Sequence, residues 1–193
     1  MLRIIGGKFK NRRIYTCEQK LLRPTAARLR ESFFNICQGG IEGTFFLDLF
    51  AGSGAVGIEA LSRGSIFTCF VEQNRCAADC IRKTVLELEQ KEHCKIVQKD
   101  ALLAVKTMTD SFDIIYMDPP YNYYENNCDY LALILEQISA RKLLKKSGLL
   151  FIEEAAPSKL ELIGPQKSGL ILEKSYKSGR SLLHRYSQHT PSS

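Results

Sequence analysis

The chain has 193 residues, of which 45% are hydrophobic and 25% are charged, and its formal net charge is +6. This length suffices for one well-buried core and is too short for two ordinary enzyme domains. The sequence has neither a signal-peptide pattern nor an apolar run of the roughly 20 residues that a membrane-spanning helix needs, so we expect a cytosolic protein with no membrane association.

The first part of the chain predicts a small basic extension. Strand-like runs at residues 2–5 and 12–15 flank a turn with Gly6 and Gly7, which indicates a hairpin, and a helix is expected over residues 25–34, after Pro24. Up to Phe33, nine basic residues stand against two acidic ones, a net charge of +7, so the remaining chain is nearly neutral. A basic arm on a neutral body is typical of binding to a polyanion, with a merely solubilising surface as the alternative. The expected contact residues are Arg3, Lys8, Lys10, Arg12, Arg13, Arg23, Arg28 and Arg30.

From Gly43 onward, short apolar runs alternate with stretches of helical periodicity. The expected strands cover residues 44–50, 66–72, 94–100, 112–117 and 148–153. The expected helices cover residues 55–63, 74–91, 101–108 and 128–145. This succession predicts an α/β fold with a doubly wound, mostly parallel sheet that carries helices on both faces.

The C-terminal part changes character. Runs 170–176 and 180–186, joined by a turn with Gly179, predict a hairpin that forms an antiparallel edge of the sheet. We therefore expect a basic extension at 1–38, a Rossmann-like domain at 39–187 and a frayed tail at 188–193.

The seven cysteines are scattered through predicted helices and strands, and we expect them to be reduced. Cys76 and Cys80 have a spacing that suggests metal binding. However, Lys83 occupies the place where an iron–sulfur motif would have its third cysteine, and no pair of histidines lies nearby. We therefore expect no metal.

A glycine-rich turn follows the first long strand. Gly52, Gly54 and Gly57 have the spacing Gly-x-Gly-x-x-Gly, which lets a backbone approach a nucleoside ligand closely and present amide donors at a helix N-terminus. The preceding Asp48 would repel a pyrophosphate, whereas it suits the ammonium and sulfonium cations of S-adenosylmethionine. The turn therefore favours S-adenosylmethionine over a dinucleotide.

Two more carboxylates end the next strands, where ligands of such sheets gather. Glu72 is placed to accept hydrogen bonds from both ribose hydroxyls, and Asp100 lies level with the expected adenine pocket. The alternative for each is a helix cap or a solvated strand end. The expected cofactor residues are Asp48, Ala51, Gly52, Ser53, Gly54, Glu72, Asp100 and Ala101.

The fourth strand ends in the run Asp118, Pro119, Pro120 and Tyr121. The prolines fix the backbone and remove two amide donors, so we expect their carbonyl groups and the Asp118 carboxylate to accept hydrogen bonds from an exocyclic amino group. Tyr121 offers a ring on which a base can stack. This predicts the catalytic site of an amine methyltransferase, with positioning and electrostatics supplying the acceleration.

The chain resembles the RsmD family of small-subunit ribosomal RNA methyltransferases. The resemblance rests on residues 3–7, 22–25 with Arg28, Arg30, Glu31, Phe34 and Asn35, 48–54, 57–64 and 118–121. It implies a class I, Rossmann-like, S-adenosylmethionine-dependent enzyme that methylates guanine N2 of 16S ribosomal RNA, free or in a small-subunit assembly intermediate. It also implies RNA binding by the basic arm, and we expect a monomer. Residues 122–127 match nothing in the family pattern.

Other functions remain open at this point. A DNA adenine-N6 methyltransferase could use the same Asp118 run, but the chain has no room for a separate recognition region. A glutamine-N5 protein methyltransferase resembles Asn-Pro-Pro-Tyr more closely, and an NAD-dependent oxidoreductase would lack an evident acid or base. A non-catalytic RNA-binding assembly factor would not need the cofactor carboxylates.

Overall fold

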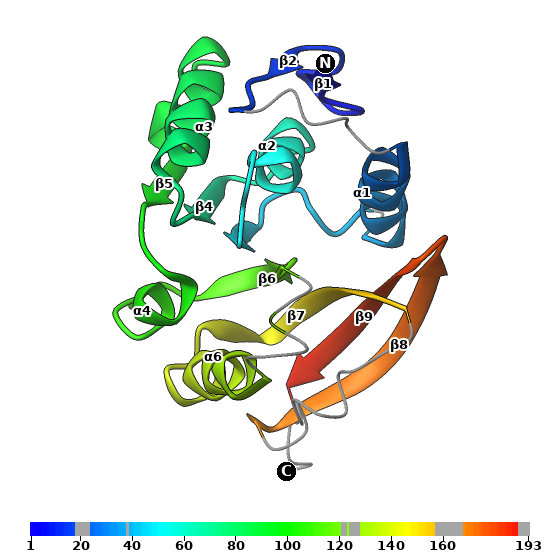
Figure 1. Ribbon diagram of the computed structural model, residues 1–193, viewed down its shortest axis with the longest axis vertical. Coiled ribbons are helices and arrows are strands. Elements are labelled where there is room, and N and C mark those ends of the chain that lie inside the picture. Colours follow the sequence, from blue (N-terminus) through cyan, green and yellow to red (C-terminus); the bar gives the residue numbers. More distant parts are fainter. Residues whose placement is uncertain (18–23, 38, 121–122, 124–127, 157–167, 189–193) are drawn as a thin grey trace.

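A computed structural model describes residues 1–17, 24–37, 39–120, 123, 128–156 and 168–188 (Figure 1). In this part of the chain a two-stranded antiparallel sheet is formed by β1 (Leu2–Arg3) and β2 (Arg13–Ile14). It confirms the expected N-terminal hairpin. Helix α1 (Pro24–Ile36) follows, close to the predicted range 25–34.

The main sheet has seven strands in the order β5-β4-β3-β6-β7-β9-β8. Its members are β3 (Phe45–Leu49), β4 (Phe67–Val71), β5 (Cys94–Val97), β6 (Phe112–Met117), β7 (Leu144–Ala155), β8 (Leu170–Ser178) and β9 (Ser181–Gln188). The first five are mutually parallel, and β9 is antiparallel to both β7 and β8. The doubly wound sheet with an antiparallel C-terminal edge is thus confirmed. Strands β3, β4 and β5 extend the sheet in one direction, and the order of strands changes direction at β6, which pairs with the other side of β3.

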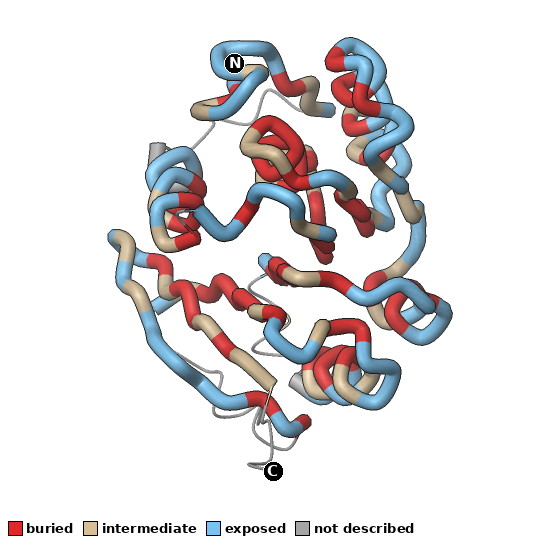
Figure 2. The backbone as a smooth tube through the Cα atoms, turned by 180° about the vertical axis from the view of Figure 1, so that it is seen from behind, coloured by how far each residue is buried: buried red, intermediate tan, exposed pale blue. Residues whose placement is uncertain are grey.

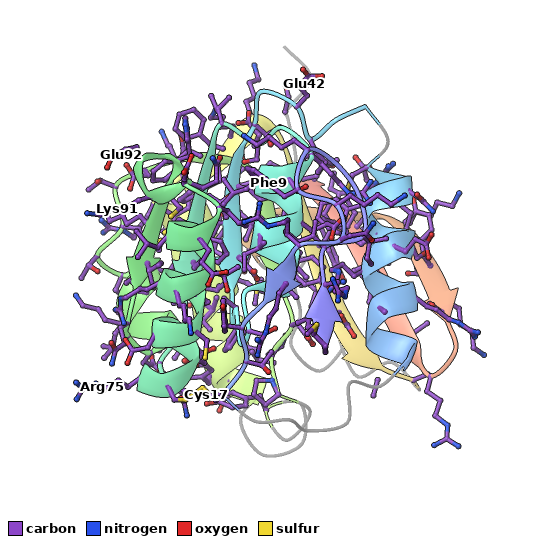
Figure 3. The ribbon with its side chains drawn as sticks, turned by 90° about the horizontal axis from the view of Figure 1, so that it is seen from above. Phe9, Cys17, Glu42, Arg75, Lys91 and Glu92 are labelled. Atoms are coloured by element: carbon purple, nitrogen blue, oxygen red, sulfur yellow. A yellow bond between two sulfur atoms is a disulfide. The ribbon has the colours of Figure 1, made fainter. Side chains whose placement is uncertain are left out.

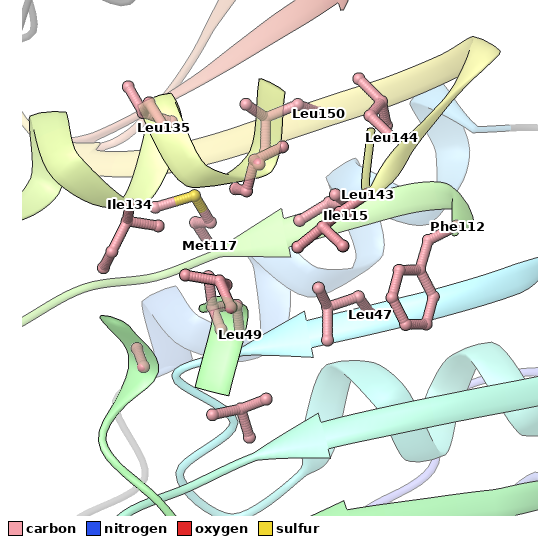
Figure 4. Packing of buried hydrophobic residues seen from close by; sticks show 14 of the residues in the cluster. Leu47, Leu49, Phe112, Ile115, Met117, Ile134, Leu135, Leu143, Leu144 and Leu150 are labelled. Carbon is pink, nitrogen blue, oxygen red and sulfur yellow. The ribbon is translucent and has the colours of Figure 1, made fainter. Parts of the chain in front are cut away.

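Helices cover both faces of this sheet. On one face, α4 (Ala101–Val105) and α6 (Cys128–Ala140) pack on a cluster that includes Leu47, Leu49 and Met117 (Figure 4). On the other face lie α1, α2 (Ala55–Ser62) and α3 (Arg75–Glu87), in contact with Phe46 and Phe70. Most residues of the central strands are buried (Figure 2). Because alternate residues of a strand point to opposite faces, both faces of the sheet are covered.

A buried carboxylate attaches the N-terminal hairpin to this body. Glu59, on α2, accepts hydrogen bonds from the backbone amides of Ile5 (2.8 Å) and Gly6 (2.7 Å). It also lies 3.0 Å from Arg63 Nε and 3.7 Å from Arg30 Nε, and its side chain is completely buried. A Cβ atom on Gly7 would lie 1.9 Å from the carbonyl oxygen of Ser62, so this close approach requires glycine.

Two helices end before their predicted ends. We expected 74–91 and 128–145, whereas α3 ends at Glu87 and α6 at Ala140. Glu89 and Lys142 take positive φ values of 56° and close each helix with a reversed turn. In that turn Gln90 N bonds Val85 O and Leu143 N bonds Ile138 O. Strand β7 therefore begins at Leu144, four residues before the predicted start at Gly148.

Shorter elements also differ from the prediction. Strand β5 ends at Val97, not at Asp100, and α4 ends at Val105, not at Met108. A short 3₁₀ turn, Lys91–His93, precedes β5. Gln188 still pairs with Leu170, and residues 189–193 of the expected tail lie outside the described residues.

The expectation of reduced cysteines is wrong for one pair. Cys17 and Cys76 form a disulfide with Cα atoms 5.8 Å apart, whereas Cys37, Cys69, Cys80 and Cys94 carry free thiols. The segment after β2 runs along α3, where Tyr15 N donates a hydrogen bond to Thr84 Oγ1 at 3.1 Å. This contact brings Cys17 to Cys76 across 59 residues of sequence, a separation at which spacing carries no signal.

Among the described helices, none combines the length and the apolar composition that crossing a membrane requires.

Substitution of Glu59 tests its role in stability. Glu59→Ala removes the acceptor of two backbone amides and leaves the buried Arg30 without its counter-charge, so we expect a loss of about 3–5 kcal/mol in the free energy of unfolding. Glu59→Gln keeps one acceptor oxygen and should cost less. Denaturant unfolding measures both, with the exposed Glu92→Ala as the control. An unchanged midpoint for Glu59→Ala would show that the hairpin is held by other contacts.

Candidate active site

Two adjoining cavities open at the carboxyl ends of the central parallel strands. We call the first, of about 380 Å³, the strand-end cleft; Gly52, Glu72, Ala101, Asp118 and Pro119 are among its lining residues. The second, of about 250 Å³, we call the inner cavity, and Arg30, Asp48, Tyr116 and Glu153 line it. Phe50, Gly52 and Asp118 line both. The two cavities therefore meet at the glycine turn and at Asp118.

The glycine turn has the open geometry that a ligand needs. Gly52 and Gly54 have φ values of 56° and 72°, and a Cβ atom on Gly52 would meet no described atom within 4 Å. A Cβ atom on Gly57 would lie 2.4 Å from the ring of Phe70, so this glycine lets α2 pack closely on β4. Gly52 thus leaves open space beside its backbone, whereas Gly57 permits close packing of the helix on the strand. Ala51 and Ser53 line the inner cavity, whereas Gly54 is not one of the described residues that line either cavity.

Glu72 holds the glycine turn from the end of β4. One carboxylate oxygen accepts from Gly52 N at 2.7 Å and the other from Asn74 N at 2.7 Å. A carboxylate has about four acceptor sites, so each oxygen can accept a further bond from a ligand in the strand-end cleft. Glu72 therefore combines a structural contact with the position expected for ribose recognition.

Asp48 is buried beneath the glycine turn. Its Oδ2 accepts from Gly57 N, in the first turn of α2, at 2.8 Å. Burial raises the pKa of Asp48 to about 7, the Gly57 hydrogen bond opposes this rise, and the charge of Glu72 adds to it. Asp48 thus contacts the helix N-terminus directly and faces the inner cavity.

Asp100, which we expected to contact the cofactor, caps a helix and binds a tyrosine. It is the N-cap of α4, accepts from Leu103 N at 3.1 Å, and accepts from Tyr130 Oη at 2.6 Å. Asp100 is not among the residues that line the strand-end cleft, whereas Ala101 and Tyr130 are. The Asp100 carboxylate therefore orients the Tyr130 ring at the wall of the cleft.

The end of β6 forms the boundary between the two cavities. Asp118, Pro119 and Pro120 line the strand-end cleft, and Tyr121 lies outside the described residues. The carbonyl of Pro120, which we expected to serve an exocyclic amino group, already accepts from Tyr123 N at 2.9 Å, so a local donor competes for it. The Asp118 carboxylate remains as the acceptor that this run presents to both cavities.

Four acidic groups meet around the inner cavity, namely Asp48, Tyr116, Asp118 and Glu153. Tyr116 donates to Glu153 Oε2 at 2.6 Å, and the pKa of Glu153 is raised by burial. The pKa of Asp118 is raised well above its usual range, first by burial, because the surrounding protein displaces water from the carboxylate, and then by the negative charges of Glu153 and Asp48. Solvent reaches the Asp118 side chain through the cleft, which moderates the effect of burial.

Most of the expected polyanion contacts lie on the surface. The exposed residues among them are Arg3, Lys8, Lys10, Arg12, Arg13 and Arg28. Arg23 lies outside the described residues. Arg30 differs from the expectation because it is buried, pairs with Glu59 and donates to the carbonyl of Arg3 at 2.8 Å. Its cation therefore faces the inner cavity instead of the outer surface.

Several residues of the site carried no sequence signal that we used. Gln73 and Lys99 line the strand-end cleft just after Glu72 and just before Asp100. Tyr123, in the unaligned run 122–127, has its ring 6.2 Å from that of Phe50 and 5.0 Å from that of Tyr130. Glu153 lies on β7, next to the end of β6. Its place directly after the apolar run 149–152 was the one available signal.

Comparison with known proteins agrees with this geometry. A family model described as "Conserved hypothetical protein 95" matches residues 2–187. Proteins named "Ribosomal RNA small subunit methyltransferase D" are similar to the chain: the one from Haemophilus influenzae is 30% identical over 90% of this chain and 88% of its own. The one from Buchnera aphidicola (strain Bp) is 32% identical over 79% and 76%.

A solved structure supports the same grouping. The Escherichia coli protein yhhF is 25% identical to this chain, covers 98% of both chains and superposes with a TM-score of 0.82. The match of nearly the whole chain to the family model confirms the resemblance noted in the motifs. The chain therefore belongs to the RsmD family, that of ribosomal RNA small subunit methyltransferase D.

Proposed function

We propose that this chain transfers a methyl group from S-adenosylmethionine to the exocyclic N2 amino group of a guanine in 16S ribosomal RNA. The observation that carries the proposal is that Glu72 and Asp118 line one cleft, so a ribose acceptor and an amine acceptor face the same space. Relatives of this chain are named as ribosomal RNA small subunit methyltransferases. The substrate would be the free RNA or a small-subunit assembly intermediate.

The strand-end cleft suits a nucleoside. Its wall of Phe50, Val71 and Tyr130 is apolar enough for an adenine ring, and the free acceptor capacity of Glu72 suits two ribose hydroxyls. The open space above Gly52 leaves room for the rest of the cofactor beside the inner cavity. When bound, S-adenosylmethionine supplies an electrophilic methyl group attached to a sulfonium.

The residues at the end of β6 would prepare the amine for reaction. The nitrogen lone pair of an arylamine is delocalised into the ring, so the amine is a weak nucleophile. By accepting a hydrogen bond from the amino group, the Asp118 carboxylate would turn the lone pair toward the methyl group and then take the released proton. The charge of Glu153 would support this step because it raises the proton affinity of Asp118.

The remaining expectations complete the proposal. Residues 1–38 would form an RNA-docking extension of the methyltransferase domain 39–187, acting as a monomer in the cytosol, with no metal in the transfer step. A DNA adenine-N6 methyltransferase and a non-catalytic assembly factor are the alternatives. Incubation with tritiated cofactor and small-subunit RNA, followed by nucleoside analysis, tests the proposal. N2-methylguanosine supports it, whereas N6-methyladenosine in DNA or no transfer to any substrate contradicts it.

Cofactor binding should depend on Glu72. Glu72→Ala removes a charged acceptor and should cost about 1.5–3 kcal/mol, or roughly 10- to 150-fold in Kd. Glu72→Gln keeps one acceptor for Gly52 N and should lose less. Calorimetric titration with S-adenosylhomocysteine measures both, with Glu92→Ala as control. Wild-type affinity in Glu72→Ala would exclude the ribose assignment.

Turnover should depend on Asp118 more than cofactor binding does. Asp118→Asn lacks the negative charge that receives the amine proton, so we expect kcat to fall about 100-fold or more while S-adenosylhomocysteine affinity stays close to that of the wild type. Single-turnover methylation of RNA and calorimetry measure the two quantities. Equal losses in both would indicate that Asp118 acts in cofactor binding.

The pH profile offers a second test of the same carboxyl groups. Asp118 must be ionised to accept the amine hydrogen, so kcat should decrease as the pH falls through its raised pKa. Glu153→Gln removes a negative neighbour, lowers the pKa of Asp118 and should move this decrease to lower pH. The exposed Glu173→Gln is the control. If the pH dependence of kcat in Glu153→Gln matches that of the wild type, Glu153 does not influence the group that accepts the amine hydrogen.

RNA binding should depend on the exposed charges of the extension. Deleting the extension would remove Ile4 and Ile14 from the core, so charge removal is the cleaner change. Lys10→Gln combined with Arg28→Gln should weaken RNA binding and flatten its salt dependence by roughly 0.7 in log–log slope per lost phosphate contact. The exposed pair Lys106→Gln and Lys146→Gln is the matched control. Equal slopes for both pairs would place the RNA surface elsewhere.

A further inference from the structure

Three cysteine sulfurs meet on the outer surface of α3, away from both cavities. Cys76 and Cys80 are one helical turn apart on α3, and Cys17 comes from the segment that follows β2. All three Sγ atoms lie within 4.8 Å of one another, and Cys17 Sγ is 3.8 Å from Cys80 Sγ. Figure 3 shows Cys17 at the end of α3 that carries Arg75. None of these residues is among those that line the strand-end cleft or the inner cavity.

We propose that, once the Cys17–Cys76 disulfide is reduced, these three thiols bind one Zn²⁺ ion. Zinc–thiolate bonds of about 2.3 Å in a tetrahedron separate neighbouring sulfurs by about 3.8 Å, the distance already present between Cys17 and Cys80. The Cys76–Cys80 spacing alone lacked a third ligand, and the fold supplies it from Cys17. Thiolates are the ligands that zinc prefers.

The surroundings of the three sulfurs suit this ion. A shallow cavity of about 460 Å³ is lined by Arg75, Cys76, Asp79, Cys80 and Lys83, so solvent can supply the fourth ligand. Three thiolates and Zn²⁺ together carry one negative charge. The cations of Arg75 and Lys83 and the carboxylate of Asp79 at the same cavity leave one net positive charge, which offsets that of the metal site.

The oxidised and the metal-bound forms exclude each other, because two of the three ligands share a bond in the disulfide. A dithiol reductant would deliver two electrons and two protons to Cys17 and Cys76 and would itself become a disulfide. Zinc would then replace the thiol protons of Cys17, Cys76 and Cys80, releasing them to water. In both forms the segment after the basic hairpin stays attached to α3.

Cobalt and zinc titration of the reduced, metal-free protein tests the proposal. We expect one equivalent of Co²⁺ to produce the absorption bands of tetrahedral thiolate coordination, and one equivalent of Zn²⁺ to abolish them. Cys80→Ser and Cys17→Ser should weaken Zn²⁺ binding at least tenfold in a competition with a chelating indicator. Cys94→Ser, at a partly exposed thiol outside the cluster, should bind like the wild type.

The oxidised wild-type protein is a second control that needs no substitution. With its disulfide intact it should bind no equivalent of Co²⁺ under the same conditions, and reduction should restore binding. Absence of thiolate bands in the reduced protein would overturn the proposal. So would equal Zn²⁺ affinity of Cys80→Ser and wild type, or uptake of the metal by the oxidised form.

Discussion

The buried carboxylate of Glu59 is the contact on which the arrangement of the site depends. It lies on α2, whose first turn contacts Asp48 through Gly57, and it holds the backbone of Ile5 and Gly6 and the side chain of Arg30. The hairpin, α1 and the glycine turn are therefore fixed to one helix. A charge taken out of water is tolerated there because two amides and two guanidinium groups compensate it.

This constraint divides the cations of the basic segment into a buried one and an exposed set. Arg30 points inward to Glu59 and the inner cavity, while Lys10, Arg13 and Arg28 of the same segment stay exposed. A segment anchored by one buried ion pair can present its other cations in a fixed register. RNA docked on those cations would be held at a defined position relative to Asp118, which is what orientation of a weak nucleophile requires.

Sequence patterns predicted the sheet and its strand-end carboxylates because apolar periodicity and glycine spacing are local signals. They did not predict the features that depend on a contact between distant residues or on a rare backbone conformation. Glu89 and Lys142 end their helices with positive φ values that these residue types seldom adopt, so no glycine marked the ends. Likewise Cys17 meets Cys76 because the segment after the hairpin runs along α3, and Arg30 of α1 meets Glu59 of α2 across 29 residues of sequence.

The inner cavity also bears on which base reacts. Asp48, Tyr116 and Glu153 project to the same side of neighbouring strands, close to Asp118, so three carboxyl groups surround the space beside the guanidinium of Arg30. Grouped carboxylates repel one another, and part of that cost is relieved when a ligand donates hydrogen bonds to them. Guanine presents its ring N–H beside its amino group, two adjacent donors, whereas adenine presents an acceptor beside its amino group. A pocket rich in carboxyl groups therefore suits guanine better than adenine, and this preference supports the proposed methylation at N2.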